Sequence, residues 1–321
     1  MTPPAGPGDS ATVMKRSFLC VGQLVADIVV RPVRSLPPPG RAEPVEDVEL
    51  VSGGCAANTA AVLAKLGAEA RLSALVGRDA LGDAALADIK AAGVIVDAVG
   101  RVDGLPTAAA IVLVDDAGQR SFYYRAGGCE MLTNAHVPNA LLKKAAVVHI
   151  GGAMKLLRLD MGELARRAKS LGCLTSLDTD WDVAGRWMAR IEGALPVLDY
   201  LLTNEEEAAM LTGEKAPREA GRALLVRGPG AVVVKRGARG ALLVTRDGAA
   251  EFPAYPVKAV DTTCAGDAFA AGFLLGAVGG ASLEDAVRQG NAAGALCTTR
   301  VSHRGVTSLE AVRRLMAEGQ R

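Results

Sequence analysis

The sequence predicts an α/β fold in which helices pack on a mainly parallel β-sheet. Half of the 321 residues are hydrophobic but only 3% are aromatic, so the core has to be built from Ala, Val and Leu, which suits Ala-lined helices on a Val-rich sheet. Residues 71–77, 79–93 and 94–99 have the patterns of a strand, a helix and a second strand, the order typical of a parallel sheet. The length suits one large domain with an accessory piece, or two small domains.

The composition indicates small molecules as ligands. The formal net charge is +1, which gives no sign of a nucleic-acid or membrane surface as the main partner. The six cysteines stand singly, without the paired spacing of a metal or redox motif, and no apolar run is long enough to span a bilayer. Residues 1–16 are predicted to be a disordered tail without the features of a signal peptide. We therefore expect a cytoplasmic protein.

The first strand is predicted at Phe18–Gly22, and its apolar pattern continues to Val30 with an interruption at Asp27. A carboxylate in a buried strand is costly unless it is paired. Asp27 is therefore expected either to accept hydrogen bonds from backbone at a turn or to accept them from the hydroxyl groups of a polyol. The residues alone do not decide between these two roles.

Three further strands are predicted to form a small sheet beside the main body. Residues 45–50 alternate between apolar and polar, and residues 107–114 and 119–125 form a pair of strands joined by a turn. We expect this accessory sheet to be formed by about residues 31–50 and 104–126. An exposed apolar face on such a sheet usually needs a partner or a ligand.

A pair of glycines precedes an Ala-rich helix that runs to about Leu66. Gly53 and Gly54 permit a close approach of the backbone to a ligand, and Asn58 within the helix can offer a donor and an acceptor to neighbouring hydroxyl groups. For an isolated pair of glycines, a plain turn from strand to helix is the commoner explanation.

Two acidic segments follow predicted strands. Asp178, Asp180 and Asp182 could bind a metal, but carboxylates at a strand end also cap the next helix, and we favour capping. Asn204 and Glu207 have the spacing of a capping box that begins a helix. Further on, residues 231–242 predict two strands around a basic turn that contains glycines, which on its own is a simple hairpin with solvated cations.

The stretch 261–274 carries the strongest chemical signal. An extended run before it and small apolar residues at helical spacing within it predict a loop that enters a helix. The first turn of a helix has unpaired N–H groups and the positive end of the helix dipole, so the small residues Cys264, Ala265 and Gly266 would let a phosphate approach. Asp267 would lie beside that anion, where a carboxylate can take a proton from an alcohol. From Asp267 alone, capping of the helix is the commoner explanation.

Taken together, these motifs resemble those of a known family. D-T-T-x-A-G-D-A-F at 261–269, followed by A-A-G-F, resembles the C-terminal signature of the ribokinase-like (PfkB) carbohydrate kinases. G-G-x-x-x-N at 53–58 and N-x-x-E at 204–207 resemble two other motifs of that family. The resemblance covers roughly residues 17–315. It implies a three-layer α/β/α sandwich with a mainly parallel central sheet and a small β-sheet lid, so that residues 17–321 would form one kinase domain.

The resemblance also implies roles for individual residues. Asp267 would be the catalytic base, and the backbone of residues 264–267 would form an anion hole for the transferring phosphoryl group. Cys264 departs mildly from the family, in which Gly or Ala is usual, and its small side chain should leave the backbone path intact. The residues implied to bind the sugar are Asp27, Gly53, Gly54 and Asn58.

ATP and Mg²⁺ are implied as the cofactors. Glu207 and Asn204 would hold the water shell of Mg²⁺, a role that can coexist with a capping box. Asp261 and Thr263 would belong to a site for a monovalent cation such as K⁺, although the V-S-H-R-G sequence that would complete this site is less regular than in relatives. The residues implied to bind ATP are Lys235, Gly237, Gly240, Thr262 and Asn291.

The resemblance thus implies an ATP-dependent sugar kinase that acts on a small sugar of the ribose, fructose or keto-deoxy type, and a homodimer formed through the lid. A nucleoside kinase would need aromatic side chains around a base, and this chain has few. A sugar-phosphate kinase would need convergent Lys or Arg side chains near the lid, for which Arg120 and Arg125 are candidates. A sugar-binding regulator that has lost catalysis is the alternative from a different class.

Overall fold

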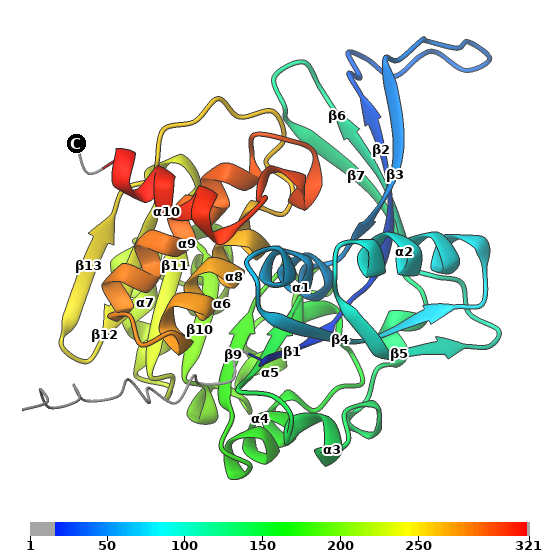
Figure 1. Cartoon of the computed structure of the whole chain (residues 1–321). Helices are drawn as coiled ribbons and strands as arrows, with labels where there is room; N and C mark the ends of the chain where they lie inside the picture. Colours follow the sequence, from blue (N-terminus) through cyan, green and yellow to red (C-terminus); the bar gives the residue numbers. More distant parts are fainter. Residues whose placement is uncertain (1–16, 320–321) are drawn as a thin grey trace, which may run out of the picture.

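The computed structural model describes residues 17–319 and confirms the predicted three-layer α/β/α sandwich (Figure 1). Within these residues a nine-stranded sheet has the order β13-β12-β11-β10-β9-β8-β1-β4-β5. Neighbouring strands from β11 to β5 are parallel, and β12 and β13 add antiparallel strands at one edge. The predicted tail at residues 1–16 lies outside the described residues. The strands are β1 (Ser17–Gly22), β4 (Glu69–Gly77), β5 (Ile95–Val102), β8 (Val147–Gly151), β9 (Leu174–Asp178), β10 (Tyr200–Asn204), β11 (Ala231–Lys235), β12 (Ala241–Thr245) and β13 (Gly248–Phe252).

Helices cover both faces of the sheet and enclose one hydrophobic core on each side (Figure 1). One face carries α1 (Cys55–Lys65), α2 (Ala80–Ala91), α8 (Ala265–Val278), α9 (Leu283–Cys297) and α10 (Leu309–Glu318). The other carries α3 (Asn139–Leu142), α4 (Met161–Ser170), α5 (Met188–Ile191), α6 (Glu205–Thr212) and α7 (Pro217–Leu225). Within residues 17–319 no helix is both long and apolar enough to cross a membrane.

Small residues bring α8 and α9 together, and this contact fixes where α8 begins. A Cβ atom on Gly272 would lie only 2.8 Å from the Cβ of Ala293 and from the backbone oxygen of Gln289. The helices can approach this closely only because the positions are Gly and Ala. The predicted strand, helix and strand at residues 71–99 are confirmed as β4, α2 and β5, and the hairpin at 231–242 is confirmed as β11 and β12.

A second sheet stands off the main body at the upper right of Figure 1. It has four strands within the described residues, in the order β3-β2-β6-β7. All neighbours are antiparallel except β2 and β6. The accessory sheet predicted from the sequence is therefore present. The strands are β2 (Val25–Arg31), β3 (Asp47–Gly53), β6 (Ala109–Val114) and β7 (Arg120–Arg125).

The strand predicted at Phe18–Gly22 is confirmed as β1, but the apolar segment that continues to Val30 belongs to a different strand, β2. β1 ends at Gly22, where φ is +157° and a Cβ atom would lie 2.3 Å from the oxygen of Gly151, and β2 then enters the small sheet. The small sheet accordingly begins at Val25 and not at about residue 31. Two apolar strands in direct succession give a single apolar pattern, and only their different partners separate them.

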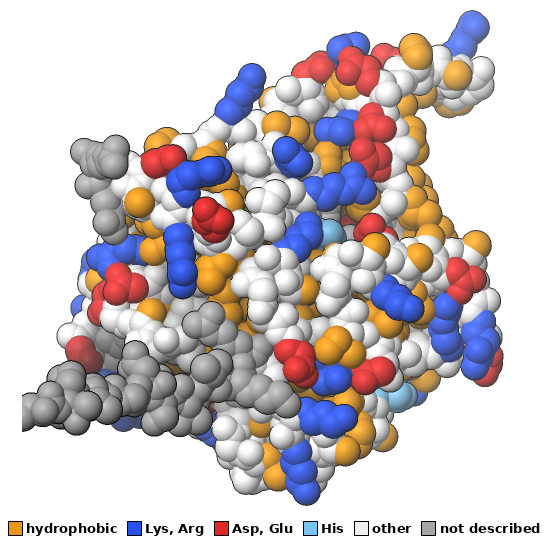
Figure 2. Space-filling model, viewed as in Figure 1, with side chains coloured by type: hydrophobic (Ala, Val, Ile, Leu, Met, Phe, Trp, Pro, Cys, Tyr) orange, Lys and Arg blue, Asp and Glu red, His pale blue; other side chains and the backbone are white. Residues whose placement is uncertain are grey.

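The two faces of the small sheet differ in what covers them. The inner face is packed, with Val29, Val112 and Val114 buried against Val301 of the main body. The outer face leaves large apolar side chains in solvent, and Figure 2 shows hydrophobic side chains along this part of the molecule. The exposed residues that carry this outer face are Val48, Leu50, Ile111 and Tyr123.

Candidate active site

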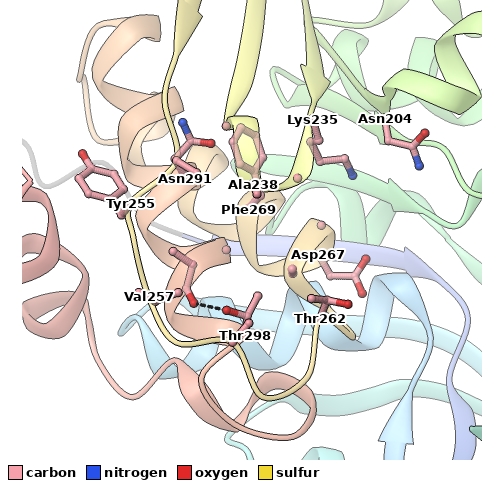
Figure 3. Close-up of a pocket in the computed structure, with 18 of the residues that line it drawn as sticks. Asn204, Lys235, Ala238, Tyr255, Val257, Thr262, Asp267, Phe269, Asn291 and Thr298 are labelled. Atoms are coloured by element: carbon pink, nitrogen blue, oxygen red, sulfur yellow. Dashed lines mark hydrogen bonds between the residues drawn. The ribbon is translucent and has the colours of Figure 1, made fainter. Parts of the chain in front are cut away.

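A cavity of about 770 Å³ opens where β9, β10 and β11 end, beside the first turn of α8. The carboxyl ends of parallel strands are where open α/β sheets bind ligands. Figure 3 shows Asp267 and Lys235 near one end of the cavity, and Tyr255 and Asn291 near the other. The cavity therefore has a charged end and a more apolar end.

The first turn of α8 presents unpaired backbone N–H groups to the charged end. Cys264 precedes the helix with φ of +62°, a left-handed conformation that costs a residue other than glycine roughly 1 kcal/mol. Among residues 17–319 no acceptor is found for the N–H groups of Gly266 and Asp267. With the helix dipole behind them, these two donors are suited to an anion such as phosphate.

Asp267 is held by the helix that carries the Gly-Gly motif. Asn58 of α1 donates a hydrogen bond from Nδ2 to Asp267 Oδ2 at 2.8 Å, joining residues 209 positions apart. Burial raises the pKa of Asp267 to about 6, while the Asn58 bond and the charge of Lys235 act in the opposite direction. A carboxylate with this pKa is mostly ionised at neutral pH and can still accept a proton readily.

Asp27 extends from β2 toward the same place. Burial and, to a smaller extent, the nearby charge of Asp267 raise the pKa of Asp27 to about 7, although Lys155 acts in the opposite direction. Gly53 has to be glycine, because a Cβ atom there would lie 1.9 Å from Oδ2 of Asp27. Gly54 has φ of +96° and a Cβ there would lie 2.6 Å from the oxygen of Gln23. None of the four predicted sugar-binding residues lines the cavity itself, but Asn58 contacts Asp267 and Asp27 lies close enough for its charge to interact with that of Asp267.

Replacing Gly53 with Ala is expected to lower the free energy of unfolding by about 1–3 kcal/mol, because the new methyl group would overlap the carboxylate of Asp27. Urea unfolding measures the effect. Gly193→Ala is the matched control, since nothing lies within 4 Å of its Cβ position. Asp27→Ala combined with Gly53→Ala should recover most of the loss, and a Gly53→Ala protein as stable as Gly193→Ala would contradict this account.

Two acidic residues at and just after the end of β9, Asp178 and Asp180, each form an ion pair with a lysine at the site. Asp178 accepts from Lys235 Nζ at 2.7 Å with each of its oxygens. Asp180 Oδ2 lies 2.8 Å from Lys155 Nζ, and its Oδ1 accepts from the Met154 N–H at 2.8 Å. Burial raises the pKa of Asp178 to about 7 despite Lys235. Burial lowers the pKa of Lys235, but the charges of Asp178, Glu207 and Asp267 together with the hydrogen bonds to Asp178 outweigh it, so the net pKa is raised.

The prediction that the acids of this segment cap the next helix is therefore wrong. Asp178 and Asp180 form ion pairs, and Asp182 accepts from the N–H groups of Ala184, Arg186 and Trp187 in the turn before α5, a helix without a side-chain cap. Sequence reasoning missed Lys155 altogether. The only local signal was the spacing of Asp178 and Asp180, which places them two apart at the end of a strand. Lys235, which pairs with Asp178, lies on β11, and Lys155, which pairs with Asp180, lies in the turn after β8.

Lys235 lies directly over the turn that would receive the anion. A Cβ atom on Gly266 would be 3.1 Å from Lys235 Nζ, so glycine leaves room for the ammonium group beside the free N–H donors. The ammonium and the two amides therefore converge on one volume at the start of α8. This is a suitable site for a highly charged phosphate.

Glu207 and Asn204 form the predicted capping box at the start of α6. The Asn204 Oδ1 accepts from the Glu207 N–H at 2.8 Å, and the Asn204 N–H donates to Glu207 Oε2 at 3.1 Å. Thr179 also donates to Glu207 Oε2, at 2.6 Å. Both side chains nevertheless line the cavity. A fixed carboxylate and an amide oxygen at a cavity wall fit the water shell of Mg²⁺.

Asp261 joins the loop before α8 to the loop after α9. Its Oδ1 accepts from the N–H of Thr263 at 2.8 Å and from the Thr263 hydroxyl at 2.5 Å. Its Oδ2 accepts from the N–H of Ser302 at 3.0 Å. Both oxygens of Asp261 are thus already used to hold the two loops together.

The more apolar end of the cavity contains the remaining predicted nucleotide residues. Gly237, Gly240, Thr262 and Asn291 all line it. Asn291 donates to the oxygens of Phe252 and Pro253, each at 3.0 Å, and a Cβ atom on Gly240 would lie 2.0 Å from the oxygen of Phe252. Sequence reasoning did not identify Tyr255 and Phe269, whose side chains also line this end.

The two arginines considered for a phosphate-bearing acceptor point to different places. Arg120 lines the cavity, and its guanidinium carbon lies 5.6 Å from the centre of the Phe122 ring. Arg125 instead donates to the backbone oxygen of Thr107 at 2.9 Å. Only one of the two is therefore placed to meet a ligand in the cavity.

Comparisons with known proteins extend over almost the whole chain. The sequence profile of the pfkB family carbohydrate kinases matches residues 15–308. The ATP-dependent ribose-1-phosphate kinase of Halopiger xanaduensis is 32% identical over 301 residues, which cover 94% of this chain and 98% of that protein. The solved structure of Arabidopsis thaliana ribokinase complexed with ribose and ATP has a TM-score of 0.79 at 26% identity, covering 94% of this chain and 98% of that one. The adenosine kinase of Sinorhizobium meliloti has a TM-score of 0.81 at 28% identity, covering 94% and 99%.

Proposed function

The chain belongs to the pfkB family of carbohydrate kinases and is an ATP-dependent sugar kinase, and we propose that Asp267 is the general base of its phosphoryl transfer. The observation that carries this proposal is the position of the Asp267 carboxylate, next to unpaired N–H groups at the start of α8 and fixed by Asn58. A base and an anion site that adjoin each other are what transfer from ATP to an alcohol requires.

Asp267 would take the proton of the acceptor hydroxyl as its oxygen attacks the γ-phosphoryl group of ATP. The bond from the acceptor oxygen to phosphorus forms while the bond to the leaving ADP oxygen breaks. Asp27 and Asn58 would hold other hydroxyl groups of the sugar so that one hydroxyl lies against Asp267. The raised pKa of Asp27 makes it able to donate as well as accept hydrogen bonds near neutral pH.

The backbone of residues 264–267 would stabilise the charge that develops on the transferring group. The N–H groups of Gly266 and Asp267 are fixed before the reaction begins, so no reorganisation is needed when charge builds up. Lys235 would exchange part of its contact with Asp178 for a phosphate oxygen. The adenine and ribose of ATP would occupy the end of the cavity lined by Gly237, Gly240, Thr262 and Asn291.

The residues implied to hold Mg²⁺ suit their ion better than the residues implied to hold a monovalent cation. Glu207 and Asn204 would hold Mg²⁺ through its water molecules, and Mg²⁺ when bound supplies neutralisation of charge on the ATP phosphates. Asp261 and Thr263 fit a monovalent cation less well, because Asp261 Oδ1 accepts two hydrogen bonds and its Oδ2 accepts one, whereas Glu207 Oε1 has no donor among residues 17–319. No step of the mechanism is derived through a monovalent ion.

The kinase proposal is tested by ADP release in the presence of Mg²⁺ and ATP. The acceptor panel contains pentoses, hexoses, keto-deoxy sugars, sugar phosphates and nucleosides, so that the alternative acceptors are tested alongside. We expect turnover with a sugar-containing acceptor. Thermal stabilisation by an acceptor without ADP release from any member would instead favour a sugar-binding regulator.

The pH profile of kcat is expected to fall below pH 6, roughly tenfold per pH unit, because Asp267 must be ionised to act as the base and its pKa is raised to about 6. Above that pH the rate should level off. Asn58→Ala should move the acid limb to higher pH, since the Asn58 donor lowers the pKa of Asp267. Steady-state rates between pH 5 and 8 measure the wild-type profile and its shift in Asn58→Ala. An acid limb that stays fixed or moves to lower pH in this variant would contradict the assignment of Asp267 as the base.

We further propose that the outer face of the small sheet forms a homodimer. Leu50, Ile28, Ile111 and Tyr123 are successive cross-strand neighbours, so they form a continuous apolar row across all four strands. Three of these side chains, those of Leu50, Ile111 and Tyr123, are exposed. An exposed apolar face of this kind is typical of an interface.

Leu50→Glu combined with Ile111→Glu is expected to convert the dimer to a monomer, because a charge would then lie on each of the two facing surfaces. Light scattering coupled to size-exclusion chromatography measures the mass. Val226→Glu is the control, since Val226 is exposed but lies on the helical side of the main body. A monomeric wild-type protein at micromolar concentration would overturn the dimer proposal.

A further inference from the structure

We propose that Lys155 binds an anionic substituent of the acceptor, so that the acceptor sugar carries a phosphate or a carboxylate besides the hydroxyl that is phosphorylated. This inference rests on the proposed kinase function and narrows its substrate class. It starts from the second of the two ion pairs that follow β9, which the mechanism above does not use.

The ammonium group of Lys155 is held in place by an acidic and an aromatic side chain. Its Nζ lies 2.8 Å from Asp180 Oδ2 and 5.3 Å from the centre of the Tyr124 ring on the inner face of the small sheet. Asp180 is fixed in turn by the N–H of Met154, the residue before Lys155. The ammonium group is therefore held between the end of the large sheet and the small sheet.

The ion pair is oriented with its positive end outward. The side chain of Lys155 is 30% exposed, whereas that of Asp180 is 9% exposed. The pair at the other lysine has the same orientation, with Lys235 15% exposed and Asp178 2% exposed. Each pair thus has a buried carboxylate that holds its lysine in place and leaves the ammonium group the more accessible partner.

The two lysines have different neighbours. Lys235 lies against Gly266, where the phosphoryl donor is proposed to bind. Lys155 instead interacts electrostatically with Asp27 and Cys55, groups on the proposed acceptor side. Burial lowers the pKa of Lys155, but Asp180 and the nearby cysteines together outweigh it, so the net pKa is raised. A cation at the acceptor side is therefore present at neutral pH in addition to the one at the donor side.

A neutral sugar would not need this second cation. Its hydroxyl groups find partners in Asp27 and Asn58, which offer both acceptors and donors. A charged ammonium group kept partly buried next to them gains most from an anion, because a charge-assisted hydrogen bond is roughly twice as strong as a neutral one. Lys155 is the more exposed member of its pair, and its partner Asp180 lines the cavity.

The test compares acceptors that differ in charge. Ribose is compared with ribose 1-phosphate and ribose 5-phosphate, and fructose with 2-keto-3-deoxygluconate, so that phosphate and carboxylate are distinguished. We expect wild-type kcat/KM to favour an anionic member of at least one set. Lys155→Met should lower kcat/KM for that acceptor by about 10- to 100-fold, mainly through KM. The KM for ATP should stay within about twofold, and Lys155→Arg should retain most of the activity.

Controls separate this role from a loss of folding. Lys155→Met leaves Asp180 buried without its partner, so Lys155→Met combined with Asp180→Asn is measured alongside and should show the same selectivity change. Lys169→Met removes a similar pair, with Asp199 at 2.8 Å. Asp199 directly precedes β10, whereas the cavity opens at the other end of that strand, so this variant should leave selectivity unchanged. The inference would be overturned if the wild type had the higher kcat/KM for the neutral member of both sets. It would also be overturned if Lys155→Met lowered kcat/KM equally for neutral and anionic acceptors. Either result would leave the kinase function intact.

The inference can also be decided if no acceptor is phosphorylated, an outcome that would count against the kinase proposal itself. The same acceptors are then titrated by calorimetry into wild type and Lys155→Met with a non-hydrolysable ATP analogue present. Binding of an anionic acceptor that is lost in Lys155→Met supports the role of Lys155. Binding of neutral acceptors only contradicts it, as does the absence of any binding.

Discussion

Asp267→Asn is expected to lower kcat by about 10²- to 10⁴-fold, the range typical for the loss of a general base. The amide keeps the size of the side chain but cannot take the proton of the acceptor hydroxyl. The KM values for ATP and acceptor should change little, because the N–H groups at the start of α8 are unaffected. Coupled ADP-release kinetics at pH 7.5 measure both parameters.

The stability of this variant supplies an independent check. Burial raises the pKa of Asp267 in the folded protein, so its contribution to stability is present at low pH and is lost as pH rises through about 6. Asp267→Asn should therefore unfold at the same or a slightly higher temperature than wild type at pH 8. Asp285→Asn is the matched control, because Asp285 also lies in the first turn of a helix but is exposed. An Asp267→Asn protein with full activity would remove Asp267 from the mechanism.

Lys235→Met is expected to lower the free energy of unfolding by about 3 kcal/mol at pH 8, because it leaves Asp178 buried without a counter-charge. The loss should be smaller at pH 6. Asp178 already has a pKa raised to about 7 in the folded protein, and removing Lys235 raises it further, so at pH 6 the acid is protonated and no charge is left buried. Urea unfolding at the two pH values measures the difference.

Combining Lys235→Met with Asp178→Asn should recover most of the stability at pH 8, since neither charge then remains. Lys169→Met is the control for the loss of a lysine from a more exposed pair, and its effect should stay below about 1 kcal/mol. If Lys235→Met lost the same stability at pH 6 as at pH 8, burial of an unpaired Asp178 carboxylate would not be the cause.

The sequence predicted the parts of this protein that depend on local pattern. The loop and helix at 261–274, the Gly-Gly turn at 53–54 and the capping box at Asn204 each have their signal within a few residues. The order of strand, helix and strand was visible for the same reason, because periodicity is local. The prediction failed between β1 and β2, where two apolar strands follow each other and no local feature shows that they join different sheets.

By itself, then, the sequence determined the fold class, the turn proposed to bind an anion and the carboxylate that follows it, since these depend on backbone conformation and on residues close together in the chain. Only the tertiary structure decided which charges meet. Asn58 reaches Asp267 across 209 residues, and Asp178 and Asp180 meet lysines from β11 and from the turn after β8. The energy of an ion pair depends on the distance between the charges and on their burial, and neither can be read from the separation of two residues in the sequence.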